Sequence, residues 1–152
     1  METLKTVEIV EQLRQALAAR NYNGFVDMFA ADALFEVPFG LKENQKRLEG
    51  IDAIRAHFDV IAQNPSTKLL ELHKVSATQH QGSDADTATV EFRIQGKSIL
   101  TGKLFEMPSS VAIIRCSKGK VKHYKDFPNA IGYAQIAGVI PQLAASLTKS
   151  IE

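Results

Sequence analysis

The hydrophobic pattern of this chain changes at Lys68, and that change limits the possible folds more than any other feature. Before it, apolar residues recur every three or four positions, as in amphipathic helices. After it come four runs with the composition of β-strands, separated by turn-forming residues. Short turns between consecutive strands force those strands to run antiparallel. The predicted strands cover residues 68–80, 86–96, 98–107 together with 109–116, and 120–127.

The first part of the chain is predicted to be mainly helical. Asp32 is expected to close the second helix, and Pro38, which cannot donate to a β-ladder, is expected to end a short strand. A polar loop should follow over residues 40–50. The apolar spacing predicts helices over residues 4–19, 22–31 and 51–63, with the short strand over 33–38.

Glycine and proline mark further boundaries. Gln95-Gly96-Lys97 predicts a turn, and Pro108 predicts a bulge or break in its strand. Residues 130–150 are predicted to be helical but interrupted by Gly138 and Pro141. We find no repeat and no linker, so we expect a single domain over residues 1–152, with a core over about 5–128 and a C-terminal helical extension over about 130–150.

The order of these elements predicts an α+β fold, a curved antiparallel sheet packed against three helices from the N-terminal half. The long helices can bury their apolar sides only against one face of such a sheet. If the sheet curls, a cone-shaped cavity results.

Composition narrows the class of protein. Of 152 residues, 45% are hydrophobic and 23% charged, with a net charge of +1, which argues against disorder and against a nucleic-acid-binding surface. The single cysteine, Cys116, excludes an internal disulfide and is expected to be a packed thiol. The beginning of the sequence lacks the features of a signal peptide, and no apolar stretch approaches membrane-spanning length, so a cytoplasmic location is expected. The spacing of the histidines gives no support for a metal site.

Three segments resemble the SnoaL-like branch of the nuclear-transport-factor-2-like, or ketosteroid-isomerase-like, superfamily: residues 29–40, 50–58 and 119–129. The resemblance implies a cone-shaped α+β barrel with a hydrophobic pocket between the helices and the concave face of the sheet. It also implies a homodimer that forms through the convex face. This superfold hosts isomerases, hydrolases, cyclases and binding modules, so fold alone does not fix function.

The ketosteroid isomerases of the superfamily suggest where a base could lie. Their catalytic carboxylate precedes the Pro-Phe-Gly corner, where this chain has Val37, and their oxyanion-stabilising tyrosine would fall near Leu13. A hydrocarbon side chain can neither accept a proton nor donate a hydrogen bond. Glu36 is adjacent, but it should point to the opposite face of its strand. The resemblance therefore disfavours steroid-isomerase chemistry by that route.

Asp126 is the leading catalytic candidate. In the epoxide-hydrolase and polyketide-cyclase relatives, an acid at this place on the last strand points into the cavity and moves protons. Between Tyr124 and Phe127, an inward carboxylate should be desolvated, which would raise its pKa. The alternative is a carboxylate that forms a salt bridge or caps the following helix.

Arg93 and His57 match parts of other family sites. Epoxide-hydrolase relatives have an Arg-x-Asp pair near Arg93, but Gln95 replaces the acid, which favours a solvated or dimer-facing stripe instead. Phenazine-biosynthesis relatives use a helix histidine at the position of His57 and a serine one turn later, where this chain has Ile61. A half-buried histidine at the edge of the core is the favoured interpretation.

Two functions remain open at this stage. The first is a cofactor-independent isomerase, cyclase or hydratase/hydrolase acting on an apolar, oxygenated small molecule, with Asp126 transferring the proton and Tyr124, His57 or Arg93 orienting the substrate. The second is a non-catalytic ligand-binding or dimerisation module. We expect no nucleic-acid or membrane partner. The C-terminal segment should either cover the mouth of the cavity or pack on a partner subunit. The expected apolar contacts come from Leu13, Leu17, Phe25, Phe29, Val37, Phe39 and Ile61.

Overall fold

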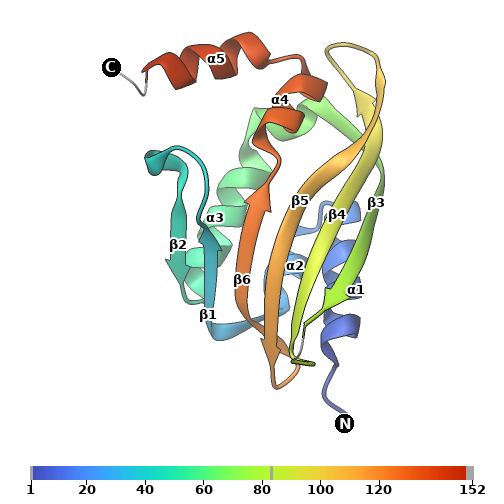
Figure 1. Cartoon of the computed structure of the whole chain (residues 1–152), viewed down its shortest axis with the longest axis vertical. Coiled ribbons are helices and arrows are strands. Elements are labelled where there is room, and N and C mark those ends of the chain that lie inside the picture. Colours follow the sequence, from blue (N-terminus) through green and yellow to red (C-terminus); the bar gives the residue numbers. More distant parts are fainter. Residues whose placement is uncertain (1, 83, 150–152) are drawn as a thin grey trace.

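A computed structural model gives the structure of the protein and describes residues 2–82 and 84–149. Its six strands form one sheet in the order β2-β1-β6-β5-β4-β3, curved and not closed (Figure 1). β1 runs parallel to β6, and every other neighbouring pair is antiparallel. The strands are β1 (Phe29–Val37), β2 (Lys46–Glu49), β3 (Leu70–Gln81), β4 (Thr87–Ser98), β5 (Leu104–Ser117) and β6 (Lys120–Pro128).

Helices cover the concave face of this sheet. α1 packs against β3 and β4, and α3 packs against β1, while α2 lies between the two helices (Figure 1). The helices are α1 (Thr6–Ala18), α2 (Tyr22–Asp27), α3 (Ile51–Gln63), α4 (Ala130–Ala137) and α5 (Ile140–Lys149), with short 3-10 turns η1 (Lys42–Asn44) and η2 (Pro65–Leu69). The predicted α+β architecture is therefore confirmed. No helix in the described part of the chain is long and apolar enough to cross a membrane.

Aromatic side chains form the centre of the core. The ring of Phe25 lies 5.6 Å from Phe29, 5.0 Å from Phe58 and 5.7 Å from Tyr124, centroid to centroid. Phe25 is only 1% exposed. Offset and edge-on pairs of this kind each add about 0.5–1.5 kcal/mol beyond their buried area. The cluster joins α2, α3, β1 and β6, and so fixes how the helices sit on the sheet.

The second helix and the first strand differ from the prediction. α2 ends at Asp27, not at residue 31, and β1 begins at Phe29, not at residue 33. The prediction that Asp32 closes a helix is wrong, because Asp32 lies in β1 and forms an ion pair with Lys122 of β6. The parallel partner β6 explains the early start, since Phe29 pairs with Val121 across it. The loop predicted over 40–50 also contains the short strand β2, whose charged sequence carries no strand signal.

Gly96 does not form the predicted turn. β4 continues through it to Ser98, and the turn lies over 99–103 before β5 begins at Leu104. A Cβ atom at position 96 would lie 1.9 Å from the backbone oxygen of Glu71 on β3. Glycine is therefore needed inside the strand, because a neighbouring backbone approaches closely. In the sequence, such a glycine cannot be told from one that forms a turn, which explains the wrong prediction.

Pro108 marks a β-bulge, as predicted. Arg93 of β4 pairs with Pro108 and Phe92 pairs with Ser110, so Ser109 is the extra residue on β5. Ser109 is 5% exposed. The predicted interruption of the C-terminal helical segment is also confirmed. Gly138, with φ 77°, ends α4 in the left-handed conformation, and Pro141 lies in the first turn of α5.

Candidate functional site

A cavity of about 170 Å³ lies between the helices and the concave face of the sheet. The sheet contributes to it from β3, β4, β5 and β6, and α1, α2 and α4 supply the rest. β4 and β6 present alternate residues to this side, whereas irregularities in the pairing of β3 and β5 change that spacing. The lining residues are Leu17, Tyr22, Leu72, Val75, Phe92, Ile94, Ser109, Ser110, Tyr124, Asp126, Pro128 and Tyr133.

Asp126 brings a carboxylate into this cavity. It lies on β6 opposite Ala112 of β5, on the concave side, and it keeps partial access to solvent through the cavity. No other described residue forms a hydrogen bond or ion pair with its side chain. Burial without a compensating partner raises the pKa of Asp126 from 3.8 to about 7. The alternatives of a salt bridge or a helix cap do not apply, since Asn129 is the residue that caps α4.

Tyr124 forms part of the cavity wall. It is buried, and its ring stacks on Phe35 at 5.2 Å with an interplanar angle of 15°. Burial, and secondarily the charge of Asp126, raises the pKa of Tyr124 well above 10. The hydroxyl is therefore neutral at physiological pH, and it can donate a hydrogen bond next to the carboxylate.

Tyr133 and Ser109 are cavity residues that the sequence did not reveal as a pair. Tyr133 lies on α4 and is 37% exposed as a whole residue. Desolvation of its hydroxyl raises the pKa of Tyr133, and the nearby Ser109 side chain lowers it by a smaller amount. The Asp126 carboxylate is also close enough to raise the pKa of Tyr133. The bulge directs Ser109 inward, and the position of α4 is fixed by Asn129, whose side chain accepts from Gly132 N at 3.0 Å and donates to Pro108 O at 2.9 Å. A bulge beside a tyrosine-bearing helix is the signal that could have suggested the pair.

Most of the predicted apolar contacts lie elsewhere. Leu13 of α1 is completely buried in the core, and the residue one turn later, Leu17, lines the cavity instead. Val37 and Phe39 line a separate apolar groove of about 550 Å³, beside α4 and α5. Phe39 is 69% exposed and its ring contacts Phe127 at 5.0 Å. Leu17 was therefore predicted correctly and Leu13 was not, because a helical repeat of about 3.6 residues places both on the inner side of α1 and the spacing alone does not distinguish them.

His57 and Ile61 pack at the edge of the core on α3. The His57 ring lies 5.6 Å from Phe35 and 5.3 Å from Phe58. Burial, followed by the charge of Lys46, lowers the pKa of His57. Ile61 packs against the same core. The half-buried histidine that the sequence favoured is what the structure contains.

Arg93 lies on the convex face of the sheet. Its neighbours Phe92 and Ile94 point into the core, and its guanidinium lies 3.9 Å from the Glu106 carboxylate, with 39% of the side chain exposed. Glu36 also points to the convex side, as expected, and its Oε1 lies 2.6 Å from His123 Nε2. Neither residue is directed toward Asp126, so the structure separates Arg93 from the proposed site.

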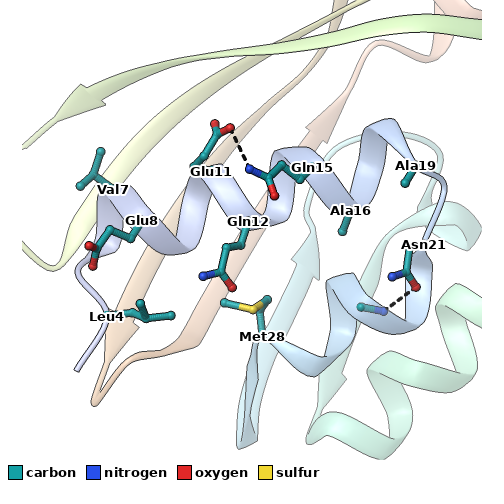
Figure 2. Close-up of a pocket in the computed structure, with 11 residues that line it drawn as sticks. Leu4, Val7, Glu8, Glu11, Gln12, Gln15, Ala16, Ala19, Asn21 and Met28 are labelled. Atoms are coloured by element: carbon teal, nitrogen blue, oxygen red, sulfur yellow. Dashed lines mark hydrogen bonds between the residues drawn. The ribbon is translucent and has the colours of Figure 1, made fainter. Parts of the chain in front are cut away.

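A larger hollow lies over the outer side of α1 and shares no lining residue with the cavity at Asp126. Figure 2 shows its polar side chains along α1, with Glu11 accepting a hydrogen bond from Gln15 at 3.3 Å. Asn21 accepts one from Gly24 N at 2.9 Å at the start of α2. The hollow measures about 820 Å³ and is wide open to solvent. Among residues 2–82 and 84–149, no group of three or more His, Cys, Asp and Glu side chains could hold a metal ion.

Comparison with known proteins identifies the family to which this fold belongs. The family model described as the SnoaL-like domain matches residues 10–124. The chain belongs to the SnoaL-like domain family. The uncharacterised protein YesE of Bacillus subtilis (strain 168) is 26% identical to this SnoaL-like chain over 128 residues, which cover 84% of the chain and 83% of YesE. Asp126 and Tyr133 both lie just beyond the stretch that the family model matches.

Solved structures with the same fold include a candidate isomerase from Bacillus subtilis, at 21% identity and TM-score 0.70, covering 88% of this SnoaL-like chain and 92% of the other. A candidate polyketide cyclase from Pseudomonas putida KT2440 matches at 15% identity and TM-score 0.64, covering 88% and 98%. RV0760c from Mycobacterium tuberculosis, solved with estradiol-17beta-hemisuccinate, matches at 17% identity and TM-score 0.56, covering 80% and 91%. At these identities the likeness concerns the fold.

Proposed function

We propose that this SnoaL-like protein is a cofactor-independent enzyme that transfers a proton on an apolar, oxygenated small molecule, with Asp126 as the acid or base. The observation that carries the proposal is a carboxylate inside the cavity that has no hydrogen-bond or ion-pair partner among the described residues, with its pKa raised to about 7. A general acid or base is most effective when its pKa lies near the working pH. Environments that perturb a carboxylate in a cavity are typical of functional sites.

Two reaction classes fit one such carboxylate. In hydration or hydrolysis, the ionised Asp126 deprotonates a water molecule as it attacks the substrate, and the resulting carboxylic acid protonates the carbon or the leaving oxygen. Isomerisation or cyclisation needs no water. The ionised Asp126 removes a proton from a carbon or a hydroxyl group, and the resulting carboxylic acid returns that proton to another atom of the same molecule. Tyr124 and Tyr133 border the same cavity, and their hydroxyl groups can hydrogen-bond to the substrate oxygen. The candidate isomerase and candidate cyclase among the structures of this fold support this class.

The test begins with the titration of Asp126 by NMR of labelled carboxyl carbons, which requires no substrate. An apparent pKa near 7 supports the enzyme. Activity is then measured on a panel of small cyclic ketones, with Asp126→Asn compared against Glu106→Gln, an exposed carboxylate of the convex face. Asp126→Asn should keep the fold but turn over substrate about 100-fold more slowly or worse, whereas Glu106→Gln should keep both the fold and the turnover. Full activity of Asp126→Asn would refute the role.

A non-catalytic binding module is the second candidate. It is favoured by the incomplete catalytic sets, since Val37, Gln95 and Ile61 stand where family relatives have functional side chains. Under this alternative the cavity binds a ligand and returns it unchanged. A titration of Asp126 near its ordinary value of 3.8, together with ligand binding that Asp126→Asn does not alter, would favour the module over the enzyme.

We also propose a homodimer in the cytoplasm. The convex face of β5 exposes Val111 and Ile113, 38% and 39% respectively, in the centre of the sheet, which is compatible with the dimer that the family resemblance implies. Replacing both by arginine should give a monomer in light scattering. α5 offers a rival contact, since none of its described residues is buried. A chain that lacks residues 139–152 and remains dimeric would rule out dimerisation through α5.

A further inference from the structure

The cavity beside Asp126 has room for one six-membered ring. It measures about 170 Å³, and an apolar protein cavity of about 150 Å³ holds one benzene molecule. Pockets for larger, drug-sized ligands occupy about 300–1,000 Å³. A steroid, with four fused rings, is far larger than this cavity.

The cavity also has two chemically different sides. Phe92 and Ile94 on β4, with Leu72 and Val75 on β3, form an apolar side together with Leu17 of α1. The opposite side is polar, because β5, β6 and α4 contribute hydroxyl and carboxyl groups there. A molecule that fills both sides therefore needs an apolar ring and a hydrogen-bonding oxygen.

Tyr133 completes the polar side from outside the sheet. Its helix is anchored by Asn129, which bonds both to the first turn of α4 and to Pro108 at the bulge. Tyr133 lines the cavity together with Ser109, Asp126 and Tyr22, and its hydroxyl is close enough to all three for each to influence the pKa of Tyr133. A phenolic hydroxyl can donate one hydrogen bond and accept another. An oxygen bound at this place would therefore meet both the Tyr133–Ser109 pair and the Asp126 carboxyl group.

We infer that the cavity binds a molecule with a single ring and one oxygen substituent, such as a phenol or a cyclic ketone, and that Tyr133 and Ser109 hold the oxygen beside Asp126. The ring lies against Phe92 and Ile94. This inference rests on the proposed function for the location of the site and adds the class of ligand. It makes α4 a functional part of the site, and it predicts weaker binding of a steroid, which would extend beyond the cavity.

The experiment measures the binding of four probes to the full chain by calorimetry and by ¹⁹F NMR where the probe has fluorine. The probes are 4-fluorophenol, fluorobenzene, 6-fluoro-2-naphthol and estradiol. We expect 4-fluorophenol to bind, fluorobenzene to bind about tenfold more weakly because it lacks the hydrogen-bonding oxygen, and the two larger probes not to bind. Tighter binding of estradiol than of 4-fluorophenol, or no binding of 4-fluorophenol, would overturn the proposed ligand class.

Variants then test the two hydroxyl groups. Tyr133→Phe and Ser109→Ala should each weaken the binding of 4-fluorophenol about three- to tenfold, the usual effect of losing one hydrogen bond. The affinity for fluorobenzene should not change. The matched control is Ser76→Ala, because Ser76 pairs with Arg93 and lies on the convex side of the sheet, away from the cavity. Equal losses for both probes would mean a purely structural role for Tyr133 and would refute its assignment.

The two proposals fail in different ways. If 4-fluorophenol binds as expected but Asp126→Asn retains turnover, the ligand class stands and the proton-transfer role of Asp126 is wrong. If a multi-ring substrate is converted and Asp126→Asn abolishes that conversion, the proton-transfer role stands and the single-ring inference is wrong.

Discussion

Replacing Asp126 by Asn should change the pH dependence of stability in a way that requires no knowledge of the substrate. In the unfolded chain the Asp126 carboxyl group ionises near pH 3.8, whereas in the folded protein its pKa is about 7. Because the pKa is raised by folding, the stability that the protonated group allows is fully present below pH 3.8 and is lost as the pH rises to 7. An asparagine side chain is neutral at every pH, so the Asp126→Asn protein does not lose this stability as the pH rises.

The size of the effect follows from the two pKa values. They differ by about three pH units, and each unit corresponds to about 1.4 kcal/mol, so ionised Asp126 costs the folded state about 4 kcal/mol above pH 7. Water that enters the cavity screens the carboxylate, which makes this figure an upper bound. About 3 kcal/mol of it develops between pH 5 and pH 8, and a domain of this length then shows a change of about 6–12 °C in melting temperature.

The assay is urea unfolding of the wild-type chain and Asp126→Asn at pH 5 and pH 8, with melting temperatures as a second measure. Comparing the two chains at each pH removes the contributions of all other titrating groups. Asp59→Asn on α3 makes the same chemical change at an exposed position and should leave a small difference at both pH values. A free energy difference between wild type and Asp126→Asn that does not grow from pH 5 to pH 8 would refute the desolvated carboxylate.

Three further predictions concern other parts of the molecule. Asn129→Ala removes the cap of α4 and should cost about 1 kcal/mol and speed amide exchange in α4; unchanged exchange would contradict this. Gly96→Ala places a Cβ against the Glu71 backbone and should lower the free energy of unfolding by about 2 kcal/mol or more, measured by urea; a neutral result would contradict the overlap. The Cys116 thiol, buried and with its pKa raised to about 11, should react with a disulfide reagent only after unfolding; rapid reaction of the native protein would contradict that burial.

The sequence predicted the elements whose signals are local. The third helix begins and ends where the spacing of Ile54 and Phe58 placed it, and the bulge at Pro108 follows from the missing amide hydrogen. The start of β1 was mispredicted because the residues around Ala30 and Asp32 are equally compatible with a helix end. What decides their conformation is the parallel pairing with β6, about 90 residues later in the chain, and no local pattern records such a contact.

The candidate site was predictable in part. The resemblance suggested Asp126, and the structure directs it into the cavity beside Tyr124. Among the other suggested contacts, Leu17 also lines the cavity, whereas Leu13, one helical turn earlier, is buried in the core, and strand alternation turns Arg93 to the convex side. Tyr133 could not be assigned, because its place depends on how α4 folds back over the end of the sheet.

The bulge at Ser109 has a consequence for how this protein can tolerate insertions and deletions. It lets Met107 and Ser110 face the same side of β5 although their numbers differ in parity. Loss of a single residue here would invert one half of the strand, either turning Val111 and Ile113 into the core or turning Met107 out of it. The hairpin at Lys118 and Gly119 has no such constraint on strand faces. Length variation among relatives should therefore gather at the hairpins and avoid the middle of β5.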